Sequence, residues 1–373
     1  MKTWWKSIYG IFLVCILFLS PVACNDGGGN QPPPGSSSPS FAYVVNNIDG
    51  TIFAYTINAS TGALTPVLGS PWGAGFLPTS VAVDKSGTFA FVANLNGLIQ
   101  YEIFDDGALQ PIFQGITGNG PLSVAVDPSG NFVYVANSGS DNVSAFTIDA
   151  SGVLSPMAGS PFSAGTDPIS VAVDPSGQFV YVVNSGTDNV SVFAIDASSG
   201  ALTPVSCPFC GAGNIPCSVA VDPSGNFVYV TNSEDDNVSA YTIDTSTGAL
   251  MHTPLDEMPF AAGNGPVSVA VDPSGHFVYV ANIDSGNVSA FTIDASSGEL
   301  TPVIGSPFTT GGSPQSVAVD PSGQFVYVAN GGTGFNKVLA FTIDTSTGVL
   351  TPVSGSPFLA GNTPSSVTTG TSQ

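Results

Sequence analysis

The sequence predicts an all-β protein, a seven-bladed β-propeller built from four-stranded antiparallel blades. Two observations carry this prediction: one unit recurs from residue 41 onward, and each copy holds four strand candidates separated by turn residues. The element Ser-Val-Ala-Val-Asp recurs at intervals of 43 to 50 residues, beginning at Ser80, Ser123, Ser170, Ser218, Ser268 and Ser316. The element Phe-Val-Tyr-Val-Ala-Asn, or a variant of it, begins at Phe41, Phe89, Phe132, Phe179, Phe227, Phe277 and Phe325.

Each unit divides into four short strands. The first, Ser-Val-Ala-Val, has small side chains, and the second, Phe-Val-Tyr-Val-Ala-Asn, is a continuous apolar run typical of a strand buried on both faces. The third, Asn-Val-Ser-Ala-Phe-Thr-Ile, alternates, and the fourth begins Leu-Thr-Pro-Val, whose proline suits an edge strand. Asp-Pro-Ser-Gly joins the first two strands, and we expect its aspartate to cap a type I turn.

The two ends of the repeat region complement each other. The region begins with a second strand at residues 41–46 and ends with a degraded first strand at residues 366–369. A linear stack of such units needs capping repeats, and none is visible. We therefore expect the strand at 366–369 to pair with the strand at 41–46, which completes the seventh blade and removes the open edges of the ring.

The repeats carry a family signature. Residues 229–232 read Tyr-Val-Thr-Asn, and near copies stand at residues 134–137, 181–184, 279–282 and 327–330. From residue 41 to 373 the pattern resembles the YVTN-repeat and lactonase-type superfamily of seven-bladed β-propellers, which has the 6-phosphogluconolactonase fold. The resemblance implies a lactone hydrolase with its cleft at one end of the propeller. Because propellers host unrelated functions, the fold alone does not fix the activity.

The charge of the chain limits its partners. There are 26 acidic residues and no arginine, and two of the four lysines, Lys2 and Lys6, lie in the predicted signal peptide. The mature chain therefore keeps only Lys85 and Lys337 against 26 acids, a net charge of −24. Such a surface repels nucleic acid and anionic lipid headgroups. We expect no nucleic-acid partner and contact with a membrane only through a lipid anchor.

The N-terminus reads as an export signal. Lysines precede an apolar run from Ile8 to Leu19, which is short for a membrane span, and residues 1–23 are predicted to be a signal peptide. Cys24 follows Val-Ala and resembles the lipidated cysteine of a bacterial lipoprotein, although Pro21 stands where that motif usually has leucine. Ordinary cleavage near Ala23 is the alternative. Residues 24–40, rich in Gly, Pro and Ser, are predicted to be a tether in the cell envelope, periplasmic or at the cell surface.

Residues suited to catalysis are few. A phosphorylated sugar acid needs cationic clamps, but Lys85 lies in a turn and Lys337 starts a third strand, so the two should lie at opposite ends of a blade. His276 occupies a variable turn position and His252 lies in an insertion near an outer edge, so we expect both to be surface residues. The sequence contains neither a Gly-x-Ser-x-Gly elbow nor a His-Glu-x-x-His motif. No catalytic residue is therefore nominated.

Acidic residues should ring one end of the propeller, in the loops between second and third strands. Two interpretations stay open for this ring, a solvated face or a Ca²⁺ site, with Glu234-Asp235-Asp236 as its densest point. The candidate cation ligands are Asp141, Asp188, Glu234, Asp235, Asp236 and Asp284. No cofactor other than Ca²⁺ is suggested.

Three cysteines cluster in the segment Cys207-Pro-Phe-Cys210 and at Cys217. A metal site lacks a fourth ligand within the segment, so we expect a disulfide after export, with Cys217 bonded to Cys207 or to Cys210. The features together favour a monomeric, non-catalytic envelope lipoprotein whose propeller binds a protein, a glycan or a divalent cation. The alternative is a lactonase-like hydrolase, with assistance by a metal left open.

Overall fold

The structure is a computed structural model that describes residues 39–252, 259–332 and 336–371. The signal peptide predicted for residues 1–23, the lipidation expected at Cys24 and nearly all of the tether predicted for 24–40 lie outside these residues. The chain divides into two units, and the second, Ser38–Gln373, contains all of the strands described below. Among the described residues, no helix is long and apolar enough to cross a membrane.

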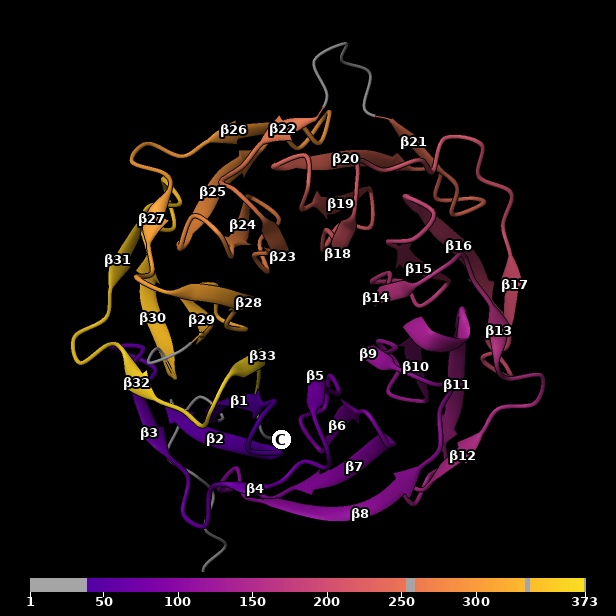
Figure 1. Ribbon diagram of the computed structural model, residues 1–373, viewed down its shortest axis with the longest axis horizontal. Coiled ribbons are helices and arrows are strands. Elements are labelled where there is room, and N and C mark those ends of the chain that lie inside the picture. The colour runs from indigo at the N-terminus through magenta and orange to yellow at the C-terminus, as the bar shows by residue number, and fades with distance from the viewer. Residues whose placement is uncertain (1–38, 253–258, 333–335, 372–373) are drawn as a thin grey trace, which may run out of the picture. The chain divides into compact units, whose positions relative to one another are not determined.

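Seven antiparallel sheets stand around a common axis and form the blades of a propeller (Figure 1). We number the blades 1 to 7 from the N-terminus and letter their strands a to d from the axis outward. The a strands are β33 (Pro364–Thr371), β5 (Pro78–Val83), β9 (Pro121–Val126), β14 (Pro168–Val173), β18 (Pro216–Val221), β23 (Pro266–Val271) and β28 (Ser313–Val319). The b strands are β1 (Ser40–Asn46), β6 (Phe89–Asn94), β10 (Phe132–Asn137), β15 (Phe179–Asn184), β19 (Phe227–Asn232), β24 (Phe277–Asn282) and β29 (Phe325–Gly331).

The outer half of each blade holds the remaining strands. The c strands are β2 (Thr51–Ile57), β7 (Gly97–Ile103), β11 (Asn142–Ile148), β16 (Asn189–Ile195), β20 (Asn237–Ile243), β25 (Asn287–Ile293) and β30 (Lys337–Ile343). The d strands are β3 (Leu64–Pro66), β8 (Leu109–Gly115), β12 (Leu154–Pro156), β17 (Leu202–Pro204), β21 (Leu250–His252), β26 (Leu300–Pro302) and β31 (Leu350–Pro352). In five blades a second short piece also pairs with strand c, namely β4 (Trp72–Gly73), β13 (Phe162–Ser163), β22 (Phe260–Ala261), β27 (Phe308–Thr309) and β32 (Phe358–Leu359).

The predicted closure of the ring is confirmed. The C-terminal strand β33 pairs antiparallel with β1, and the register places Ala42 opposite Thr369 and Val45 opposite Ser366. Blade 1 therefore takes its a strand from the end of the chain and its other strands from the beginning. As a result every blade has two neighbours, and each sheet packs against another sheet on both faces.

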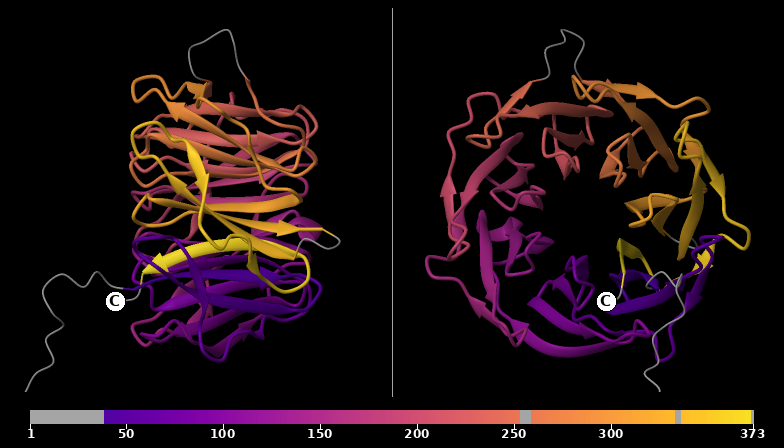
Figure 2. Two further views of the ribbon diagram at one scale, coloured as in Figure 1. Left: turned by 90° about the vertical axis from the view of Figure 1, so that its left-hand side faces the viewer. Right: turned by 180° about the vertical axis from the view of Figure 1, so that it is seen from behind.

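The two ends of the propeller carry different loops. We call the end with the a–b turns and c–d turns the turn end, and the end with the b–c loops and the d–a connections the rim end. Because β1 runs from the turn end to the rim end and β33 runs back, Ser40 and Thr371 both lie at the turn end. The strands run between these two ends in the side view (Figure 2). A 3₁₀ turn, η1 (Ser138–Ser140), lies in a rim loop.

Buried b strands form the core between blades, as their apolar sequence predicts. All six residues of β10, β15, β19 and β24 are buried, and the tyrosine of each lies between its own blade and the next one. In six blades the tyrosine hydroxyl donates to a glycine carbonyl in the next blade's c–d turn, at 2.8–3.3 Å. That glycine is required: Gly248 has a φ of +78°, and a Cβ there would collide with the ring of Phe179.

A second ring of contacts joins the innermost strands. The serine of each Ser-Val-Ala-Val element accepts a hydrogen bond from the first valine amide of the next blade's a strand, at 3.1–3.4 Å. The amide would otherwise lie unpaired on the exposed edge of the sheet. The seven donors, in blade order from blade 2 to blade 1, are Val81, Val124, Val171, Val219, Val269, Val317 and Val367.

Candidate functional site

The aspartates of the Asp-Pro-Ser-Gly turns are structural, as expected. Asp174 is buried, its Oδ1 accepts the Phe179 amide at 2.7 Å and the Gln178 amide at 2.7 Å, and its Oδ2 accepts the Ser176 amide and hydroxyl. Equivalent bonds recur in the other four Asp-Pro-Ser-Gly turns, and Asp84 of the Asp-Lys-Ser-Gly turn likewise accepts the Phe89 amide. These carboxylates are fully engaged in the turns, so they are not available as bases at the turn end.

Three of the candidate cation ligands at the rim end hold loops together. Asp141, Asp188 and Asp236 adopt a left-handed conformation, with φ of 52°, 49° and 55°. In each, Oδ1 accepts a backbone amide of the d–a connection that leaves the same blade, at 2.8–3.0 Å. The donors are Asp167, Ile215 and Gly265. In each of blades 3, 4 and 5, one aspartate side chain therefore joins the b–c loop to the d–a connection by a hydrogen bond.

The remaining candidate ligands lie in blades 5 and 6. Asp235 accepts the backbone amide of Asn214 at 2.7 Å and its side-chain amide at 2.8 Å. Glu234 and Asp284 are exposed, and no side-chain hydrogen bond forms between either carboxylate and the described residues. Within the ranges that the structure describes, no group of three or more His, Cys, Asp or Glu side chains is placed to hold a metal ion. The acidic residues are spread around the rim instead of converging.

Lys85 and Lys337 lie at opposite ends of the propeller and His276 lies at the surface, as the sequence predicts. Lys85 stands in the turn between β5 and β6 at the turn end, whereas Lys337 opens β30 at the rim end. Lys85 lines a groove of about 520 Å³ between blades 2 and 3, together with Asp84 and Asp149, whose carboxylates cap turns. His276 is a turn-end residue whose Nδ1 lies 2.9 Å from the Ser274 hydroxyl.

His252 is exposed near the outer edge of its blade, as the sequence suggests, but it also lines a pocket. It ends β21, and its ring lies against Tyr241, with centroids 5.1 Å apart. The pocket, of about 360 Å³, lies between blades 4 and 5, and Asp235, Ser239 and the glycine-rich crossing segment Gly211–Gly213 also line it. A histidine and a carboxylate in one pocket of this size are suited to bind a small molecule and to transfer a proton.

Neighbouring groups fix the walls of this pocket. Tyr241 donates its hydroxyl to the Gly211 carbonyl at 2.6 Å, and burial raises the pKa of Tyr241 to about 12, so the phenol stays neutral. Asn232 donates to Ser239 Oγ at 2.9 Å. Asp235 is held by its two bonds to Asn214. The sequence placed His252 in an insertion, whereas it ends the d strand β21; the pocket was missed because the repeat gives no signal that brings this residue near Asp235 of the b–c loop.

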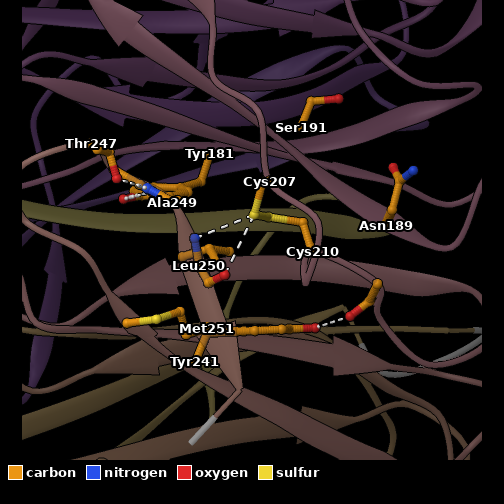
Figure 3. The surroundings of a disulfide bond; sticks show 12 residues. Tyr181, Asn189, Ser191, Cys207, Cys210, Tyr241, Thr247, Ala249, Leu250 and Met251 are labelled. Atoms are coloured by element: carbon orange, nitrogen blue, oxygen red, sulfur yellow. Dashed lines mark hydrogen bonds between the residues drawn. A yellow bond between two sulfur atoms is a disulfide. The ribbon is translucent and has the colours of Figure 1, made fainter.

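The cysteine pairing expected from the sequence is wrong. Cys207 and Cys210 form a disulfide with a Cα–Cα distance of 5.5 Å (Figure 3). Cys217 is a free thiol. Cys217 lies on the innermost strand β18, whereas the disulfide follows the outermost strand β17, so blade width separates them. Burial raises the pKa of the Cys217 thiol, which donates to the Ile215 carbonyl at 3.4 Å.

The disulfide replaces a turn that other blades build from Gly-Ser-Pro. In blades 1, 3, 6 and 7 a serine hydroxyl in that turn accepts the amide of an alanine in strand c, at 2.9–3.0 Å. In blade 4 the Cys207–Cys210 bridge stands there instead, and the Leu250 amide of blade 5 donates to Cys207 Sγ at 3.3 Å (Figure 3). The bridge therefore lies on the boundary between blades 4 and 5, beside the pocket.

Comparisons with known proteins agree with this architecture. The sequence matches the family described as lactonase, seven-bladed β-propeller, over residues 110–211, 153–257, 210–308 and 255–369. A comparison with curated sequences returned no match.

Solved structures share the fold. A proposed 6-phosphogluconolactonase from Bacteroides fragilis superposes with a TM-score of 0.77 at 22% identity, covering 91% of this chain and 99% of that one. A proposed 6-phosphogluconolactonase from Bacteroides uniformis gives 0.77 at 19%, covering 89% and 100%. The periplasmic gluconolactonase of Pseudomonas aeruginosa gives 0.73 at 20%, covering 89% and 99%. At these identities the likeness concerns the fold alone.

Proposed function

Because the chain belongs to the family of seven-bladed β-propeller lactonases, we propose that it hydrolyses an uncharged lactone in the pocket between blades 4 and 5. The observation that carries the proposal is that His252 and Asp235 line one pocket of about 360 Å³. Support also comes from two kinds of similar structure, described as proposed 6-phosphogluconolactonases and as a gluconolactonase. In this proposal the substrate is a small ring such as a sugar lactone without a phosphate group.

The charge of the chain selects the substrate class. A phosphorylated lactone needs Arg or Lys side chains around its phosphate. No arginine is present in the sequence, and neither Lys85 nor Lys337 is among the residues that line this pocket. The surrounding carboxylates would repel a phosphate, whereas a neutral lactone meets no such penalty. A preference for the uncharged substrate is therefore expected.

The chemistry assigned to the pocket is general-base hydrolysis. His252 would take a proton from a water molecule whose oxygen adds to the lactone carbonyl carbon. The ring C–O bond then breaks, and the proton passes to the alkoxide oxygen that leaves, giving a hydroxy acid. Asp235, held by Asn214, would orient the substrate or the histidine. No metal is needed for this scheme.

A second candidate function is non-catalytic binding in the cell envelope. Its support is the use of the rim carboxylates as loop latches, since Asp141, Asp188 and Asp236 each engage Oδ1 with a backbone amide. In this proposal the propeller is a monomeric scaffold for an envelope protein or a glycan. A lipid anchor at Cys24, in the periplasm or at the cell surface, is part of both proposals.

A lactone panel separates the two candidates. Initial rates with glucono-1,5-lactone, its 6-phosphate and an aliphatic lactone are measured by pH-stat, with and without EDTA. The proposal predicts turnover of an uncharged lactone, slower turnover of the phosphorylated one and no effect of EDTA. Absence of turnover on every lactone would leave the binding module as the function. Loss of turnover in EDTA would instead support a metal-assisted hydrolase.

A further inference from the structure

Large apolar side chains are exposed on one sector of the rim end, and neither proposed function uses them. Ile48, Phe76 and Leu95 are exposed by 68%, 57% and 49%. They lie on three successive loops of blades 1 and 2, and we call these three residues and Leu77 the apolar sector. Each loop is joined to the next: the Leu95 amide donates to the Phe76 carbonyl at 2.9 Å, and Asn47 Nδ2 donates to the Pro78 carbonyl at 3.1 Å.

The repeat shows that apolar residues are uncommon at these positions. The position of Phe76 in the d–a connection holds a polar or small residue in the other six connections, namely Asn119, Thr166, Asn214, Asn264, Gly312 and Asn362. The position of Leu95 holds Ser138, Ser185 and Ser233 in blades 3, 4 and 5, Asn47 and Gly331 in blades 1 and 7, and an apolar residue, Ile283, in blade 6. The fold therefore does not need an apolar side chain at either place.

The backbone beneath the sector is also strained. Leu77 has a φ of 49°, a left-handed conformation that disfavours residues with a branched side chain. The same left-handed conformation recurs at the equivalent position of other connections, at Asp167, Ile215 and Thr363 as well as at Gly120 and Gly265, so it belongs to the repeat and does not single out the sector.

From these observations we propose that the apolar sector is a docking surface for a polypeptide that carries apolar side chains next to basic ones. The apolar part of such a partner would cover Ile48, Phe76 and Leu95. Its basic part would face the carboxylates that follow around the rim in blades 3 to 6, such as Asp141, Asp188, Glu234 and Asp284. Charge complementarity of this kind guides encounter and orientation, while the buried apolar anchors supply affinity.

Charge also decides between possible occupants. A second copy of this chain would bring two acidic rims together, since the mature sequence has 26 acids and two lysines. An anionic membrane surface would be repelled in the same way. A basic polypeptide avoids both penalties. The inference is independent of lactone hydrolysis, because the sector lies on blades 1 and 2 and the pocket lies between blades 4 and 5.

The test uses substitutions that restore residues of the repeat. The double variant Phe76→Asn and Leu95→Ser introduces side chains found at the same positions in other blades, so the fold should be retained. The matched control is Leu68→Ser with Ile304→Ser, two residues exposed by 91% and 90% that follow the outer strands β3 and β26. The equivalent outer positions in blades 4 and 7 hold Ser206 and Ser354.

The probe is a synthetic amphipathic peptide of leucine and lysine, titrated by fluorescence anisotropy. Comparison peptides are one of lysine and serine with the same charge, and one of leucine and glutamate. We expect the leucine–lysine peptide to bind most tightly and to lose at least about 10-fold in affinity with the rim variant, a loss of about 1.4 kcal/mol, but not with the control variant. Binding of the lysine–serine peptide should not change.

Several outcomes would overturn the inference. An equal loss of affinity with both variants would mean that the peptide binds exposed apolar side chains non-specifically. Equal binding of the leucine–lysine and lysine–serine peptides would mean that charge alone is responsible. Tight binding of the leucine–glutamate peptide would remove the role of charge. Sedimentation that shows a dimer broken by the rim variant, or flotation with anionic vesicles that depends on Phe76, would assign the sector to another occupant.

Discussion

At the scale of single residues, the most informative position is in blade 2, where the recurring tyrosine of the b strand is missing and a residue of the neighbouring strand makes its hydrogen bond instead. Blade 2 has Phe91 where six blades have a buried tyrosine, so it lacks the hydroxyl that reaches the next blade. Its cross-strand partner is Gln100 instead of alanine or valine, and Gln100 Nε2 donates to the Gly152 carbonyl at 2.7 Å. The same contact is thus made from the neighbouring strand, which indicates that the blade-to-blade hydrogen bond matters for stability.

A pair of substitutions tests this compensation. Gln100→Ala should lower the free energy of unfolding by about 1–3 kcal/mol, because the buried Gly152 carbonyl loses its donor. Adding Phe91→Tyr should recover most of that loss, since the pair then matches the Tyr-Ala pair of blades 1, 3, 5, 6 and 7. Urea unfolding of both variants measures the effect. If the second substitution gives no recovery, the hydrogen bond has no role of its own.

Residue-scale reasoning from the sequence worked where one side chain serves its own turn. The Asp-Pro-Ser-Gly aspartates could be assigned as turn caps because their partners lie two to five residues away. The rim aspartates could not be assigned in this way. Asp141 bonds an amide 26 residues further on, and no periodicity in the sequence gives that contact. The acidic ring was expected from the sequence, but only the structure shows that its aspartates hydrogen-bond the b–c loops to the d–a connections.

At the scale of elements, blades 4 and 5 depart from the repeat at their outer strands. The Cys207–Cys210 bridge replaces a serine-containing turn, and the d strand of blade 5 leads into a blade-specific insertion. The strand order a to d was predictable from the alternation of apolar runs and turns. The pairing of the cysteines was not, because closeness in sequence does not show that β17 is the outermost strand of blade 4 and β18 the innermost strand of blade 5.

The disulfide gives a prediction at this scale. The double variant Cys207→Ser and Cys210→Ser should lower the free energy of unfolding by about 2 kcal/mol or less, because the bridge closes only a very short loop. Cys217→Ser, the matched control, should leave stability nearly unchanged. Differential scanning calorimetry measures both, and alkylation before and after reduction should label Cys217 first. Protection of Cys217 before reduction would contradict the pairing.

At the scale of the whole molecule, closure of the ring places both ends of the described chain at one end of the propeller, away from the rim loops. β33 pairs with β1, and Ser366 of β33 accepts the Val81 amide of blade 2, so the chain's last strand is bonded to the first two blades. Ser40 and Thr371 both lie at the turn end, which leaves the rim end free of the ends of the described chain.

The ring could be predicted almost completely from the sequence, because seven copies of one unit and complementary ends admit few other arrangements. The candidate site could not. His252 comes from the d strand and Asp235 from the b–c loop of blade 5, and Gly211–Gly213 of the connection between blades 4 and 5 also line their pocket. Repeats predict what the blades have in common, whereas the pocket and the apolar sector arise where individual blades differ.

The most direct test of the proposed function compares the two histidines of the chain as a matched pair. Both are substituted by glutamine, His252 in the pocket and His276 in a turn-end loop. On an uncharged lactone, His252→Gln should lower kcat/KM by about 10²-fold or more, the usual contribution of a general base, while His276→Gln should leave it unchanged. Equal rates for both variants and the wild type would contradict the assignment of the pocket.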